Sequence, residues 1–342
     1  MKKIIIPAIL LAVVIPLLFS QGNSEIQTET ETVQKETPVK IGISKLVTHP
    51  ALDSIEKGIQ DYLNVNGYNA VFDEENANAE ISTAMDIAQS FKDKKQDIVM
   101  GIATPTAQAL ATVYKNTDTP VIYCAITDPD AAGLTQTDGM NKNVCGVSDL
   151  NPIDLQIKTF QEVTNLKTLG MIYTSGEANG VAMKERAAQY CEANNIQFVP
   201  VSVINSAEVK TAALSIINRI DGLFIANDNT VVSALASVDQ VCTAANIPLF
   251  NSDITSSYGT NFLMSWGLDY YKVGLTCGKV AGDIIDGKTP AELGSIFLTD
   301  ITQFQLMINL DRAKELGLTI PQDILDNASI TIQDGKVIQA DA

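Results

Sequence analysis

Short apolar runs alternate along most of the chain with segments of helical periodicity. Positions 98–103 (IVMGIA) form an apolar run of strand length, and a polar turn with Thr104 and Thr106 follows it. Apolar residues then recur at helical spacing from Ala107 to Tyr114. The pattern predicts a strand that enters a helix through a tight turn, with Thr104 as the N-cap. Free N–H groups at such a helix start suit a carboxylate or phosphate, and an ordinary capped helix without a ligand is the alternative.

A second copy of this pattern begins at Asp221 (DGLFIANDNTVVSAL), 124 residues after the equivalent Asp97. Other segments recur at an offset of 128 residues: 41–44 with 169–172, 71–73 with 199–201, and 120–123 with 248–251. A period of this length is too long for a solenoid unit. It indicates two copies of one domain.

Both copies alternate strands with helices. We predict strands at 40–44, 69–73, 98–103, 121–125, 145–150, 169–173, 198–203, 223–226 and 249–251. Helices between them include 50–64, 178–194, 207–219, 230–245 and 270–287. This alternation predicts βαβ units, and near-continuous apolar strands are typical of a parallel sheet covered on both faces. The predicted fold class is α/β, with two doubly wound parallel-sheet lobes.

Composition agrees with a two-domain globular protein. The 342 residues are 46% hydrophobic and 18% charged, which supports a large core. The formal net charge is −17, so nucleic acid and anionic membrane surfaces are disfavoured as partners.

The N-terminus has the features of an export signal. Met1–Lys3 is basic, Ile4–Phe19 is apolar, and small residues follow at Ser20–Gly22. We predict a signal peptide at 1–22 and an exported protein, periplasmic or extracytoplasmic, with an uncleaved membrane anchor as the alternative. Position 21 is Gln rather than Cys, so lipid attachment is not supported. The polar, acidic segment 23–38 is predicted to be a disordered linker.

Catalytic motifs are scarce. The five cysteines are scattered without a CxxC pair and are predicted to be buried free thiols. His49 is the only histidine, and the sequence has neither a Walker loop nor a GxGxxG after a strand. We therefore expect no cofactor, no metal and no enzymatic activity. A carboxylate pair such as Asp128 with Asp253 remains the enzymatic alternative.

Polar residues gather where predicted strands end. In open α/β sheets the ligand crevice lies beyond these carboxyl ends, and two facing lobes would form a cleft there for a small molecule. The residues at these ends are Ser44, Thr104, Thr106, Thr127, Asp128, Ser175, Asn205, Asn227, Asp228, Asn229, Ser252 and Asp253.

Several stretches resemble one known family. They are ISKLVTHPA (43–51), IATPTAQAL (102–110), AITDPDAAGL (125–134), CGVSDLNP (145–152) and DGLFIANDNTVVSAL (221–235). Over about residues 38–330 the chain is similar to substrate-binding proteins of ABC importers associated with tryptophan and tyrosine uptake. The resemblance implies a type I periplasmic-binding fold, with two lobes joined by a hinge of three crossovers. The first lobe would be 39–148 plus 264–298, and the second 149–263 plus 299–342.

The resemblance also implies residue roles. Thr104, Thr106 and Thr127 would hold the carboxylate of an amino acid, and Asp253 would hold its ammonium. Candidates for the rest of the site stand near these residues or would stack on the ligand side chain: Asn227, Asp228, His49, Tyr173, Trp266, Ser44, Ser175 and Asn205. The implied protein is monomeric, closes around an aromatic or large apolar amino acid, and delivers it to an ABC permease with its ATPase. The alternative is a ligand-sensing module of the same fold that signals to a membrane receptor.

Overall fold

The computed structural model describes residues 37–137 and 140–340. The predicted signal peptide and the linker up to residue 36 lie outside the described residues. Within the described ranges, no helix combines the length and the apolar character that crossing a membrane requires.

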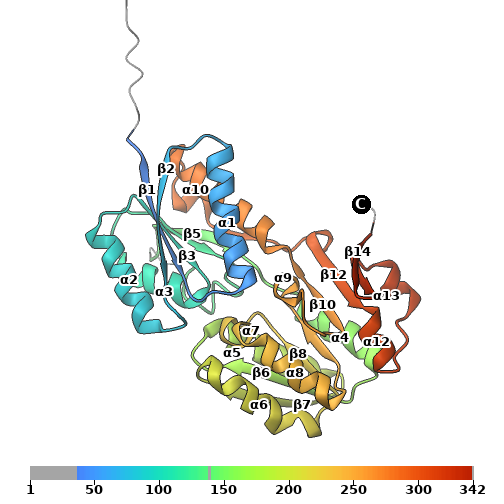
Figure 1. Cartoon of the computed structure of the whole chain (residues 1–342). Helices are drawn as coiled ribbons and strands as arrows, with labels where there is room; N and C mark the ends of the chain where they lie inside the picture. The colour runs from blue at the N-terminus through green and yellow to red at the C-terminus, as the bar shows by residue number, and fades with distance from the viewer. Residues whose placement is uncertain (1–36, 138–139, 341–342) are drawn as a thin grey trace, which may run out of the picture. The chain divides into compact units, whose positions relative to one another are not determined.

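The first lobe is built on a six-stranded sheet in which every paired strand is parallel, with the order β11-β5-β4-β3-β1-β2. Figure 1 shows α1 and α10 side by side on one face, with α2 and α3 on the other. Its elements are β1 (Val39–Lys45), α1 (Pro50–Val65), β2 (Ala70–Asn76), α2 (Ile81–Asp93), β3 (Ile98–Ile102), α3 (Thr104–Val113), β4 (Val121–Cys124), β5 (Val144–Ser148), α10 (Tyr270–Ile285), α11 (Pro290–Leu293) and β11 (Ser295–Phe297).

The second lobe has an eight-stranded sheet, ordered β14-β13-β12-β10-β9-β8-β6-β7. It is mostly parallel, in agreement with the predicted fold class, and β10–β12 and β13–β14 pair antiparallel. Its elements are α4 (Ile153–Thr164), β6 (Thr168–Thr174), α5 (Ala178–Ala193), β7 (Gln197–Val203), η1 (Ser206–Glu208), α6 (Val209–Ile216), η2 (Ile217–Arg219), β8 (Gly222–Ile225), α7 (Asn229–Ser233), α8 (Leu235–Ala245), β9 (Leu249–Asn251), α9 (Ile254–Ser257), β10 (Met264–Leu268), η3 (Ile301–Gln303), β12 (Phe304–Asn309), α12 (Leu310–Glu315), α13 (Gln322–Asp326), β13 (Ile330–Gln333) and β14 (Lys336–Gln339).

The strand order reflects the duplication seen in the sequence. The run β2-β1-β3-β4 in the first sheet has the same order as β7-β6-β8-β9 in the second. The chain passes between the sheets after β5, after β10 and after β11. The predicted lobe boundary at 264 needs a correction, because β10 pairs with β9 and β12 of the second sheet. The second crossing therefore follows Leu268.

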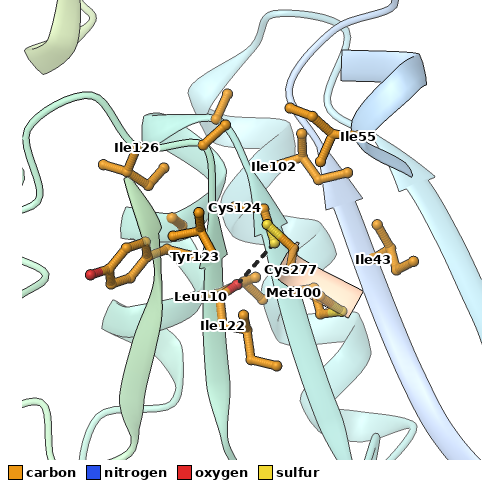
Figure 2. Close-up of a cluster of buried hydrophobic side chains, with 14 of the residues drawn as sticks. Ile43, Ile55, Met100, Ile102, Leu110, Ile122, Tyr123, Cys124, Ile126 and Cys277 are labelled. Carbon is orange, nitrogen blue, oxygen red and sulfur yellow. Dashed lines mark hydrogen bonds between the residues drawn. The ribbon is translucent and has the colours of Figure 1, made fainter. Parts of the chain in front are cut away.

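The core of the first lobe is a cluster of hydrophobic side chains from both faces of its sheet. Figure 2 shows part of it, where β3 and β4 pack with α1, α3 and α10. All five cysteines are buried, as predicted, and unpaired. Burial raises the pKa of Cys124, and the neighbouring Cys277 thiol raises it further. These thiols therefore serve as small apolar groups of the core.

Helices α1 and α10 pack closely because glycines face backbone across their contact. A Cβ on Gly58 would lie 2.4 Å from the carbonyl oxygen of Tyr271, and one on Gly274 would lie 2.3 Å from that of Ile55. This contact matters for the site, since the first turns of both helices carry side chains that line it.

Candidate functional site

A small cavity of about 20 Å³ lies where strand ends from the two sheets meet. Six of the predicted site residues line it: His49, Thr104, Thr127, Asn227, Asp228 and Asp253. The remaining lining residues are Ala51, Leu52, Ala125, Asp149, Asn179, Asn229, Val232 and Tyr270. Both sheets contribute to the wall, so the lining joins segments from the two copies of the repeat.

The first-lobe wall contains two strained turns. Ala103, after β3, has φ 81°, and Ala125, after β4, has φ 57°. Positive φ is uncommon outside glycine, and such strain is often concentrated at functional sites. Ala103 is the N-cap of α3 and Thr104 its first residue, so the predicted N-cap at Thr104 was one residue too late. The first N–H groups of α3 point out of its N-terminus toward this wall, where they would favour an anion.

Thr106 does not line the cavity. Its hydroxyl donates to the carbonyl oxygens of Ile102 at 2.7 Å and Ala103 at 2.9 Å, which ties the helix start to the end of β3. The side chain therefore stabilises the turn from within.

Asp149 is the centre of a buried hydrogen-bond network. Its Oδ1 accepts from the Thr127 hydroxyl at 3.1 Å. Its Oδ2 accepts from the Tyr270 hydroxyl at 2.7 Å and from Asn227 Nδ2 at 3.0 Å. Burial raises the pKa of Asp149 against the opposing effect of these bonds. Because Asn227 belongs to the second lobe and Tyr270 to the first, this network joins the lobes.

Asp253 follows β9 and caps the short helix α9, where its Oδ1 accepts from the Ser256 N–H at 3.0 Å. The residue is 2% exposed. Burial raises the pKa of Asp253 to about 6, and the nearby charge of Asp149 adds to that increase. No Lys or Arg is among the described residues that line the cavity. Two carboxylates thus lie near each other without a counter-charge, an arrangement that favours a bound cation.

Both carboxylate oxygens of Asp228 accept hydrogen bonds within the second lobe. Its Oδ2 accepts from the Thr174 N–H at 2.6 Å, and its Oδ1 accepts from the Thr174 hydroxyl at 2.6 Å and the Val231 N–H at 3.0 Å. Burial, and then the charge of Glu177, raises the pKa of Asp228 to about 7. Its main role is to hold the end of β6 against the start of α7.

Glu177 orients the amides of the second-lobe wall. It accepts from Asn229 Nδ2 at 2.6 Å and from Asn179 Nδ2 at 3.2 Å. Asn179 Nδ2 also donates to the carbonyl oxygen of Asn227 at 2.7 Å. With the nitrogens occupied, Oδ1 of Asn179 and Oδ1 of Asn227 are buried without partners. The wall therefore offers two free acceptors.

His49 is the N-cap residue of α1, but its side chain makes no cap hydrogen bond. It is 7% exposed, and neither ring nitrogen makes a hydrogen bond. Burial lowers the pKa of His49 to about 4, although the adjacent Asn229 opposes this. The imidazole is therefore neutral near pH 7.

The comparisons with known proteins identify the family. The family model of ABC transporter substrate-binding proteins matches residues 40–332. The chain belongs to this family. A curated protein from Clostridioides difficile (strain R20291), named tyrosine-binding protein, is 32% identical over 302 residues, which are 86% of each chain.

Two solved structures extend the comparison for this substrate-binding protein. A Streptococcus pneumoniae ABC domain in complex with L-Trp is 31% identical, with a TM-score of 0.81 over 86% of this chain and 100% of the other. A ligand-free, open substrate-binding protein with adhesive properties from Clostridium difficile is 30% identical, with a TM-score of 0.62 over 86% and 99%. The fold of this substrate-binding protein is the type I periplasmic-binding fold.

The other predicted site residues lie away from this cavity. Ser44 is buried within β1, and Ser175 donates weakly to the carbonyl oxygen of Val203 at 3.4 Å. Asn205 caps η1, and the Tyr173 ring lies under the Lys184 ammonium group at 5.5 Å. Trp266 lies on β10, where it packs against the cores of both lobes. None of these five side chains lines the cavity.

Sequence reasoning missed three important residues in this substrate-binding protein. Asp149 follows β5 within the quoted CGVSDLNP run, and the same strand-end rule would have found it. Tyr270 and Asn179 lie in the first turns of helices, so a search for polar residues after strands does not find them. Among the described residues, no group of His, Cys and carboxylates could hold a metal ion.

Proposed function

We propose that this protein captures a free aromatic amino acid, as its zwitterion, between the two lobes and delivers it to an ABC permease. The observation that carries the proposal is the pair Asp149 and Asp253, buried together at the cavity without a basic residue in the lining. The names of the relatives support the ligand class, since one is a tyrosine-binding protein and another was solved with L-Trp.

The ligand carboxylate would bind at the start of α3. The helix has ten residues, and its N-terminal N–H groups and dipole favour a negative charge. Thr104 lines the cavity at that point. Thr127 lines it next to Thr104, but its hydroxyl already donates to Asp149. Thr104 is therefore the better hydroxyl for the ligand.

The ligand ammonium would lie between Asp149 and Asp253. It has three donors, and the free Oδ1 atoms of Asn227 and Asn179 supply further acceptors. An ammonium there would relieve the unfavourable proximity of the two carboxylates. Asp253 belongs to the second lobe and the α3 turn to the first, so a zwitterion would draw the lobes together.

The ligand side chain would contact the apolar part of the wall. Ala51 and Leu52 come from the first turn of α1, and Val232 comes from α7. This part of the lining carries no charge, and it suits an aromatic or large aliphatic group.

The described cavity is too small for an amino acid, because 20 Å³ is the space of about one water molecule. The lobes must therefore separate, or the lining must shift, for a ligand to enter. At nearly equal identity, the chain superposes better on the L-Trp complex than on the ligand-free open protein, with TM-scores of 0.81 and 0.62. Both observations support hinge closure around the ligand.

Export and delivery complete the proposal. The predicted signal peptide at 1–22 and the family, whose members are substrate-binding proteins of ABC transporters, support an extracytoplasmic protein that serves a permease. Uptake of labelled amino acid by cells that lack this protein tests delivery: loss of uptake is expected, and normal uptake with only a lost signalling response would favour a sensor.

A thermal-shift panel over the standard amino acids tests the binding itself. The protein is first unfolded and refolded to remove any co-purified ligand. Ligand at 100 times its Kd stabilises the folded state by about 2.7 kcal/mol, so aromatic amino acids should raise Tm clearly. A panel in which no amino acid raises Tm would overturn the proposal.

A further inference from the structure

His49 is a buried polar side chain, and Asn229 is the neighbouring side chain that acts on its imidazole. Both Nδ1 and Nε2 lack a partner, and the residue lines the cavity. A neutral imidazole has one N–H donor and one acceptor nitrogen, and leaving either buried without a partner is unfavourable. A ligand that offers a polar group at this point would correct that.

The surroundings of His49 indicate whether its donor nitrogen or its acceptor nitrogen faces the ligand. Asn229 is the neighbouring polar group on the second lobe, and its Nδ2 is held by Glu177 at 2.6 Å. Asn229 raises the pKa of His49, as a hydrogen-bond acceptor does, so the atom that it turns toward the imidazole is its carbonyl oxygen. The ring proton belongs on the nitrogen nearer Asn229, so the other nitrogen is an acceptor.

His49 is also in the part of the wall that would contact the ligand side chain. Ala51 and Leu52, from the same helix start, and Val232, from α7 of the second lobe, also line the cavity. The carboxylate and ammonium sites are formed by other elements, α3 and the ends of β5 and β9. A polar atom on the ligand ring is thus the group that His49 is placed to recognise.

We propose that His49 is a specificity-determining residue that selects aromatic amino acids with a donor on the ring, an indole N–H or a phenol O–H, over phenylalanine. The inference rests on the proposed function, because it assumes that an amino acid occupies the cavity. Phenylalanine would bury the imidazole acceptor without a partner. Sites built around a ligand hydrogen bond reject analogues that lack the group far more strongly than apolar pockets reject size changes.

The test is calorimetry with pairs of ligands that differ only in the ring donor. L-tryptophan is compared with β-(3-benzothienyl)-L-alanine, in which sulfur replaces the indole N–H, and L-tyrosine with L-phenylalanine. For the wild type, loss of the donor should weaken binding about 5- to 150-fold, the cost of leaving a buried acceptor without a partner. His49→Phe should bring the members of each pair within about threefold of each other, mainly by improving binding of the ligand without a donor.

Two further variants keep the test decisive. His49→Gln supplies an amide oxygen as acceptor and should restore part of the preference, and it replaces His49→Phe if that variant does not fold. Tyr173→Phe, which removes a hydroxyl from an aromatic ring that does not line the cavity, should leave both ratios unchanged.

The outcomes separate this inference from the proposed function. If no amino acid binds the wild type, the proposed function fails. If amino acids bind, but the wild type does not distinguish the members of each pair, the assignment of His49 is wrong. It is equally wrong if His49→Phe retains the full preference, since the imidazole would then be only a structural part of the wall.

Discussion

The Asn227 side-chain amide donates to the Tyr270 hydroxyl at 2.7 Å, across the boundary between the lobes. The same nitrogen donates to Asp149, which in turn accepts from the Tyr270 hydroxyl. The hydroxyl is therefore donor to one lobe's carboxylate and acceptor from the other lobe's amide. These bonds stabilise the arrangement of the two lobes in which the cavity is formed.

Tyr270→Phe removes this hydroxyl and keeps the ring. The bond lost across the lobe boundary, from Asn227 to the hydroxyl, joins two neutral groups and contributes about 0.5–1.5 kcal/mol, so affinity for the amino acid should fall about 2- to 12-fold. Small-angle scattering is the matching structural measurement. Ligand should reduce the radius of gyration of the wild type, and the variant should reach the same compact form only at higher ligand concentration. An unchanged radius for the wild type at saturation would argue against hinge closure.

Asp253 should make the stability of the ligand-free protein depend on pH. In the folded state its pKa is about 6, against a usual 3.8, so folding strengthens proton binding at this carboxyl. Its stabilising contribution is complete below the unfolded pKa and is lost as the pH rises through about 6. A tenfold change in proton affinity corresponds to about 1.36 kcal/mol, so the loss is on the order of 3 kcal/mol near pH 8.

The difference in the free energy of unfolding between the wild type and Asp253→Asn separates the effect of Asp253 from that of His49 and the other titrating groups. The amide can still accept from the Ser256 N–H but cannot ionise. Urea unfolding of the ligand-free proteins should find Asp253→Asn more stable near pH 8, with the difference vanishing near pH 4. A difference that does not vary with pH would mean that Asp253 is well solvated in the folded state.

Gly274→Ala tests the close contact of α1 with α10. A Cβ at this position would lie 2.3 Å from the Ile55 carbonyl oxygen, and backbone cannot move aside as a flexible side chain does. Overpacking of this kind costs about 1–3 kcal/mol. Urea unfolding should reveal this loss, whereas Lys272→Ala, on the exposed side of the same helix, should change stability by less than about 0.5 kcal/mol. A gain of about 0.5–1 kcal/mol for Gly274→Ala, usual for an unhindered helical glycine, would contradict the packing described.

The alternation of strands and helices was predictable, because a strand buried on both faces of a sheet is a short, continuous run of apolar residues. The predicted strands at 98–103 and 223–226 are strands in the structure, with ends that differ by one residue from the prediction. The end of each element was harder to predict. Local sequence favoured Thr104 as N-cap, but the turn at Ala103 takes a positive φ that only the tertiary structure enforces.

The site was predictable only where it follows from strand ends. Asp253 and Asn227 each lie two residues after a strand of the second sheet, and both line the cavity. Tyr270 was not found, since it begins a helix after a crossover, and its position depends on where the chain returns to the first lobe. A position after a strand also predicts too many site residues. Ser175 and Asn205 follow strands but do not line the cavity, because only the strand ends at the lobe junction reach it.

In the proposed function, Asp253 binds the ammonium of an amino acid held between the lobes. Calorimetry with L-tryptophan and its deaminated analogue, indole-3-propionate, on the wild type and Asp253→Asn tests it most directly. The wild type should prefer the amino acid strongly. The variant should bind L-tryptophan about 10- to 150-fold more weakly and lose most of that preference, as expected for a hydrogen bond to a charged group. If Asp253→Asn prefers the amino acid by the full wild-type margin, Asp253 is not the ammonium partner.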